Sequence, residues 1–182
     1  MTLAAPRSTK NRRKFLNWAV IAGSALVCLL LLPMRLPGTE LLGVRPNWLL
    51  IWVVAFSVKR TQLQGTIAGL ALGLILDGMT ASHPSHAVSL GIVGWLTARL
   101  YKLRFFQEDL ISIAIVVFGM TLLYEAITAL QHSLHGLRSL ESIWETQHKA
   151  ALCCAILSSL WAPVAYYPLH RWWRRLRALE QV

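Results

Sequence analysis

The sequence is poor in charged residues and contains no long polar stretch. Charged side chains make up 14% of its 182 residues, and hydrophobic ones make up 55%. The mean hydropathy is +0.51, and long apolar runs recur along the whole chain. Soluble domains carry about 25% charged residues. The deficit leaves no room for a separate soluble domain, argues against a soluble enzyme, and predicts a single integral membrane domain.

Cysteine and the motifs of common enzymes are also scarce. No GxSxG, HExxH or Walker A motif is present, so the sequence offers no activated nucleophile and no phosphate-binding loop. Two HxxH pairs occur, at His83 and His86 and at His132 and His135, but no nearby cysteine or acid completes a metal site. We therefore expect no catalytic residue, no metal and no cofactor. Three cysteines lie in apolar runs without a CxxC motif: Cys28, Cys153 and Cys154.

Acidic residues are few, and the surplus of basic residues indicates membrane topology. Eight Asp and Glu accompany eighteen Lys and Arg, and the net charge is +10. The basic residues lie in short patches between apolar runs, so we expect no nucleic-acid partner. If the N-terminus is cytoplasmic, fourteen of the eighteen fall inside and four outside, the latter being Arg35, Arg45, Arg138 and Lys149. This bias predicts cytoplasmic termini, an even number of spans, and an inner face that contacts anionic membrane lipid.

Six apolar segments predict an all-α, polytopic bundle of six transmembrane helices. The second segment is short for a bilayer crossing, and Pro163 predicts a kink in the sixth. We expect a basic cytoplasmic N-terminal tail at residues 1–14, a membrane domain at residues 15–170, and a basic cytoplasmic C-terminal tail at residues 171–182. The six predicted helices cover residues 15–32, 47–58, 62–79, 86–101, 109–130 and 148–169.

The third segment carries a glycine at every fourth position and then an aspartate in the same register. Gly65, Gly69, Gly73 and Asp77 therefore lie on one stripe of a helix. Small residues let membrane helices approach closely, because lipid tails give no hydrophobic driving force for association. We expect the stripe either to pack against another helix of the bundle, such as the one that carries Gly94, or to receive a helix of a partner protein.

Two acidic residues lie where a membrane protein seldom carries a charge. Asp77 follows the glycines at the unfavourable end of a helix dipole, so it needs water or a polar partner. Glu125 lies about one turn from the outer surface, and intramembrane acids usually face a bundle interior or a cavity. We expect an outward-facing polar pocket around Asp77, Glu125, His83 and Arg45. The alternative is that both acids are solvated at the interface and have no special role.

Residues 45–102 resemble the rod shape-determining protein MreD family of bacteria. The resemblance rests on a proline before a short apolar helix, a basic turn, the glycine stripe that leads to Asp-Gly, and features of the following helix. These positions are Pro46, Lys59, Arg60, Gly65, Gly69, Gly73, Asp77, Gly78, Ser89, Leu90, Gly94 and Arg99. The small size and the predicted six-helix layout extend the resemblance to nearly the whole chain.

The resemblance implies a role in cell elongation at the bacterial inner (plasma) membrane. It implies a non-enzymatic scaffold that binds MreC and helps to position peptidoglycan synthesis, so that the cell keeps its rod shape. The implied partners are MreC, MreB, the RodA polymerase and a class B penicillin-binding protein. The implied fold is similar to the S components of energy-coupling-factor transporters. The alternative function is therefore that of such a substrate-binding S component, with the outer polar pocket as its ligand site.

Overall fold

Helices make up most of the part of the chain that the structure describes. The computed structural model describes residues 7–34, 40, 43–58, 60–80, 85–102, 109–134 and 140–180. In these residues the prediction of an all-α chain with six helices and no strand is confirmed. The helices are α1 (Arg7–Leu31), α2 (Trp48–Ser57), α3 (Gln62–Met79), α4 (His86–Lys102), α5 (Leu110–Leu134) and α6 (Leu140–Glu180).

Helix α2 forms the centre of the bundle. It contacts each of the other five helices, and all ten of its residues are buried. The helix begins after Asn47, whose side-chain oxygen accepts the Leu50 N–H at 3.1 Å and so satisfies one of the free donors of the first turn. A helix that is apolar on every side has no face to turn to water, and it packs inside the protein.

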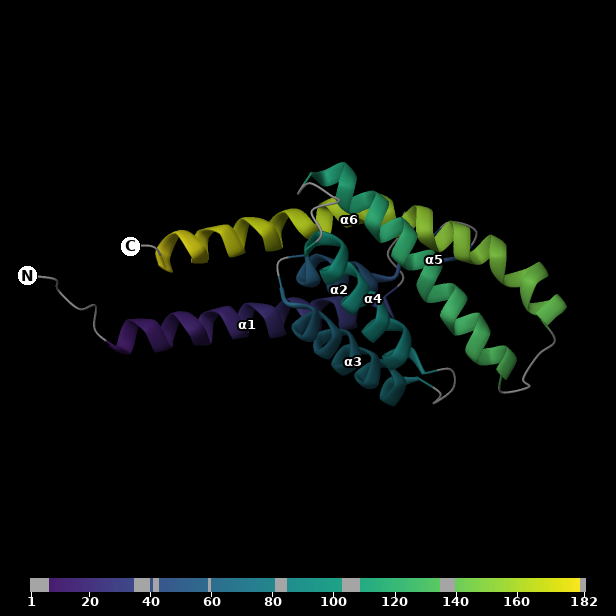
Figure 1. The fold of residues 1–182 in the computed structure, drawn as a ribbon, viewed down its shortest axis with the longest axis horizontal. Coiled ribbons are helices and arrows are strands. Elements are labelled where there is room, and N and C mark those ends of the chain that lie inside the picture. Colours follow the sequence, from purple (N-terminus) through teal and green to yellow (C-terminus); the bar gives the residue numbers. More distant parts are fainter. Residues whose placement is uncertain are drawn as a thin grey trace, which may run out of the picture.

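The long helices α1 and α6 extend from the same end of the bundle. In Figure 1 the first turns of α1 and the last turns of α6 both lie on the left of the view, away from the shorter helices α2, α3 and α4. This arrangement fits an even number of crossings between the two ends of the chain. The cytoplasmic location of the termini stays a prediction.

Two of the described helical segments are long and apolar enough to cross a membrane. They are Leu110–Leu134 in α5 and His148–Trp172 in α6, whereas Phe15–Leu31 and Trp48–Ser57 are shorter apolar helices. The ten residues of α2 rise about 15 Å, which is half of the roughly 30 Å hydrocarbon core. Crossing by all six helices therefore stays a prediction.

Some helices extend beyond the predicted segments. Helix α3 has the predicted limits, but α1 begins at Arg7 rather than at residue 15, and α6 covers Leu140–Glu180 rather than 148–169. Hydropathy marks the apolar part of a helix, whereas Lys, Arg and Glu continue a helix well outside it. The limits at residues 15 and 170 therefore fall inside helices. Helix α6 also continues through Pro163 and Pro168.

Candidate functional site

Helices α3 and α4 form a hairpin whose two backbones touch. Helix α3 starts with a capping box, in which the Thr61 hydroxyl accepts the Gln64 N–H at 3.4 Å and the Gln64 side-chain oxygen accepts the Thr61 N–H at 3.5 Å. This reciprocal pair satisfies two donors that the first turn leaves free. The capping box thus sets the first turn of α3, directly before Gly65, the first glycine of the stripe.

The glycine stripe of α3 lies directly against α4. A Cβ atom on Gly65 would lie 2.6 Å from the carbonyl oxygen of Gly94, and one on Gly94 would in turn meet the backbone of Gly65. A Cβ on Gly73 would overlap the backbone of Ala87. Side chains of any size would hold the helices apart, so the glycines permit this approach. Helix α4 of the same chain therefore covers the glycine stripe.

The carboxylate of Asp77 closes the far end of the hairpin. Its Oδ1 accepts the backbone N–H of His86 at 2.8 Å, and its Oδ2 accepts that of Ala87 at 3.2 Å. The Ser85 hydroxyl also donates to Oδ2, at 3.1 Å. Free N–H groups and the positive end of the dipole make a helix N-terminus a favourable partner for an anion. The acid at the end of α3 therefore caps α4.

The capped end of α4 is joined to α5 by side-chain hydrogen bonds. The Tyr124 hydroxyl lies 2.7 Å from Nδ1 of His86, and the two rings stack with centroids 6.1 Å apart. One turn further along α4, the Ser89 hydroxyl lies 3.5 Å from the Thr128 hydroxyl. His86 thus connects the N-terminus that Asp77 caps with the middle of the bundle.

A polar cavity opens beside this connection, where α1 and α3 end and α2 and α4 begin. Its volume is about 300 Å³, and residues of α5 form one wall. We call it the polar cavity. Its lining consists of Leu31, Leu32, Arg45, Pro46, Asn47, Trp48, Leu76, His86, Tyr124, Glu125 and Thr128.

The structure brings some of the predicted pocket residues together and separates others. Arg45 and Glu125 both line the polar cavity. Asp77 is not part of the lining, but its carboxylate accepts the backbone N–H of His86, which is. His83 lies outside the described residues. Sequence reasoning did not identify Tyr124 or Asn47 as parts of this cavity. Asn47 follows a proline and precedes an apolar run, which is the usual signal of a helix cap, whereas the position of Tyr124 depends on how α5 packs.

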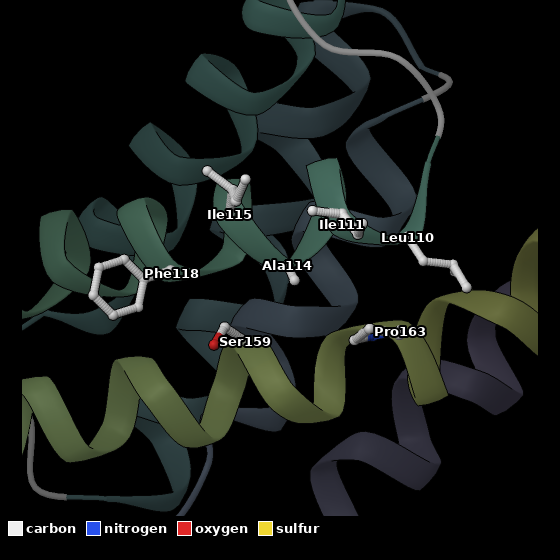
Figure 2. Close-up of a pocket in the computed structure, with 7 residues that line it drawn as sticks. All are labelled: Leu110, Ile111, Ala114, Ile115, Phe118, Ser159 and Pro163. Carbon is white, nitrogen blue, oxygen red and sulfur yellow. The ribbon is translucent and has the colours of Figure 1, made fainter.

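A second hollow lies between α5 and α6 and is almost entirely apolar. Figure 2 shows side chains from α5 on one side and Ser159 and Pro163 of α6 on the other. The Ser159 hydroxyl donates to the carbonyl oxygen of Ile156 at 2.8 Å, so it is satisfied within its own helix. This surface offers no polar group arranged for chemistry. Among the described residues, no group of three or more His, Cys, Asp and Glu side chains could hold a metal ion.

The comparisons with known proteins identify a family. A family model described as rod shape-determining protein MreD matches residues 11–172. No curated protein and no solved structure matches the chain significantly. Since the match covers most of its 182 residues, the chain belongs to the MreD family, whose members are membrane proteins with a role in rod shape determination. The predicted resemblance is confirmed, and the expected similarity to transporter S components stays a prediction.

Proposed function

We propose that this member of the MreD family is a non-enzymatic scaffold of the cell-elongation machinery. In this proposal it binds MreC in the plasma membrane and helps to position peptidoglycan synthesis, in company with MreB, RodA and a class B penicillin-binding protein. The observation that carries the proposal is the family match over residues 11–172. Peptidoglycan is made outside the plasma membrane and MreB lies inside it, so a bundle that joins the two sides suits this role.

The way in which α1 packs supports a role in binding other membrane proteins. Helix α1 rests mainly on α2, to which it is joined by a hydrogen bond from the Trp52 indole N–H to the Ser24 hydroxyl at 2.9 Å. The helix also exposes large apolar residues, including Phe15 and Trp18. Apolar surface that the fold itself does not cover is available to lipid and to helices of other proteins.

Purification from the native membrane tests the scaffold. The tagged chain would be extracted in a mild detergent, and mass spectrometry would identify the proteins recovered with it. We expect MreC in amounts comparable to the chain, with the other elongation proteins in lower yield. A matched pair of α3 variants, Gly69→Ala in the helix contact and Gly78→Ala in open space, shows whether recovery depends on the hairpin. If MreC is lost with Gly69→Ala but not with Gly78→Ala, its binding depends on the packing of α3 against α4.

The alternative function makes a different prediction for the same experiment. The polar cavity, with Arg45 and Glu125 in its wall, is the observation that favours a substrate-binding S component. Such a component would be recovered with a transmembrane coupling subunit and paired ATPases. That result, without MreC, would contradict the scaffold. A cell that loses its rod shape when the chain is depleted, and regains it when the chain is restored, would instead support a place in elongation.

A further inference from the structure

We propose that the polar cavity binds a small zwitterion, with Glu125 holding an ammonium group and Arg45 holding a phosphate or carboxylate group. Two sources share this chemistry: the headgroup of an aminophospholipid, and a free zwitterion from solution. The proposal concerns a ligand site and does not depend on the scaffold function. It follows from the size of the cavity, from the groups that are already paired in its wall, and from the two charges that are not paired with each other.

The polar cavity is larger than structural water requires. Its volume of about 300 Å³ would hold roughly ten water molecules at ~30 Å³ each. It also reaches the lower end of the range for ligand pockets, which begins at about 300 Å³. Five helices, α1 to α5, and the segment before α2 contribute to its lining. Because these elements are distant in sequence, the cavity forms only when the whole bundle is folded.

Most polar groups in the wall already have partners within the protein. The Asn47 side-chain oxygen accepts the N–H of Leu50. The Tyr124 hydroxyl pairs with His86, and the Thr128 hydroxyl donates to the Tyr124 carbonyl oxygen at 2.9 Å. These bonds satisfy the neutral groups and fix their positions.

The carboxyl group of Glu125 is the exception. It is partly buried, and within the described residues it makes no hydrogen bond and no salt bridge. A charged group in a membrane bundle is costly and usually marks a function. An ammonium group in the cavity would supply the donors and the opposite charge that this acid lacks.

The guanidinium of Arg45 provides the second half of the site. One of its terminal nitrogens donates to the Leu32 carbonyl oxygen at 3.0 Å, and its Nε lies 3.9 Å from Glu40. Arginine has five N–H donors, so others remain for a ligand. Its side chain is 40% exposed, which places it at the mouth of the cavity. Among the described residues Arg45 and Glu125 form no salt bridge, so a molecule with both charges could connect them.

Thermal unfolding of the full chain in detergent micelles tests the site. The probes are phosphatidylethanolamine added to the micelles and O-phosphoethanolamine added to the buffer, each over a range of concentrations. Phosphatidylglycerol and glycerol phosphate are the matched controls, because they keep the phosphate but lack the ammonium. A ligand that binds only the folded state raises the melting temperature, and near saturation we expect a rise of about 5 °C.

Variants assign the effect to the two charges. Glu125→Gln and Arg45→Gln should each weaken the apparent affinity by about tenfold or more. Asp109→Asn and Lys102→Gln serve as controls, since both residues are exposed and lie at the opposite end of α5 and α4. Stabilisation by the lipid alone would identify the source as a headgroup, and stabilisation by O-phosphoethanolamine would identify a free zwitterion.

Three results would overturn the proposal. The first is that neither ethanolamine compound raises the melting temperature of the wild-type chain in a saturable way. The second is that the controls without an ammonium stabilise it equally well. The third is that the charge variants respond as the control variants do. The first two comparisons use the wild-type protein alone, so they decide the matter even if a cavity variant fails to fold.

Discussion

Replacing Gly69 by alanine tests whether the contact between α3 and α4 supports the fold. The added Cβ would lie 2.7 Å from the carbonyl carbon of Leu90 and 3.0 Å from the amide nitrogen of Gly91, and it would overlap the Leu90 carbonyl oxygen. The first of these distances is about 0.7 Å shorter than the 3.4 Å at which ordinary contact begins. Because all three atoms belong to the backbone, no side chain can rotate away and the helices must separate.

The expected cost follows from two opposing terms. Overpacking of a close contact costs about 1–3 kcal/mol, while the better helix propensity of alanine returns up to about 1 kcal/mol. A net loss of about 1–2 kcal/mol corresponds to a roughly 5- to 30-fold lower ratio of folded to unfolded protein. Separation would also lengthen the hydrogen bonds from His86 and Ala87 to Asp77, so the loss should lie at the upper end of this range.

The control for this substitution lies in the same helix. Gly78 belongs to α3 as well, but a Cβ at this position would meet nothing within 4 Å. Gly78→Ala should therefore leave stability unchanged or raise it slightly through helix propensity. Both variants would be unfolded with a denaturing detergent and followed by circular dichroism. Equal stability of Gly69→Ala and Gly78→Ala would refute the claim that the backbone contact holds the hairpin together.

Three further substitutions have effects that the hydrogen bonds predict. Asp77→Ala removes the cap of α4 and should lower stability by about 1–2 kcal/mol, whereas Asp77→Asn keeps one acceptor and should lose less; equal loss would argue against the cap. Ser57→Ala should leave the melting temperature unchanged or raise it, because the buried Ser57 hydroxyl has no hydrogen-bond partner among the described residues; a clear decrease would contradict this. Trp52→Phe removes the hydrogen bond to Ser24 and should speed amide hydrogen exchange in α1 but not in α3. An exchange rate in α1 equal to that of the wild-type chain would show that other contacts hold α1.

The sequence predicts those parts of the fold that depend on local chemistry. Helix α3 has the predicted limits, and the capping residues Thr61 and Gln64 before an apolar run explain its start. Helix α4 also begins at the predicted residue. The place of α2 could not be predicted in the same way. Its short apolar segment has the composition of a core helix and of a weak membrane span alike, and only the positions of the other five helices show that it is enclosed.

The polar cavity shows the same limit at the level of single residues. Arg45 and Glu125 are identifiable from the sequence because charge is rare in an apolar chain. Their neighbour Tyr124 is one aromatic residue among many, and its bond to His86 depends on the rotation of α5 against α4. Long-range pairs of this kind arise from packing, and no spacing along the chain marks them.

The two unusual acids differ in what the fold supplies to them. Asp77 lies at the end of α3, where the dipole of its own helix is unfavourable, but the N-terminus of α4 provides two backbone N–H groups and a dipole of the opposite sense. The acid is thus stabilised by the turn that it closes, and its charge is a structural element of the hairpin. Glu125 receives no comparable donors from the described residues, although it is partly buried as well. The fold gives Asp77 three hydrogen bonds and leaves Glu125 in the wall of the polar cavity, and this difference is the reason why the proposed ligand site uses Glu125 rather than Asp77.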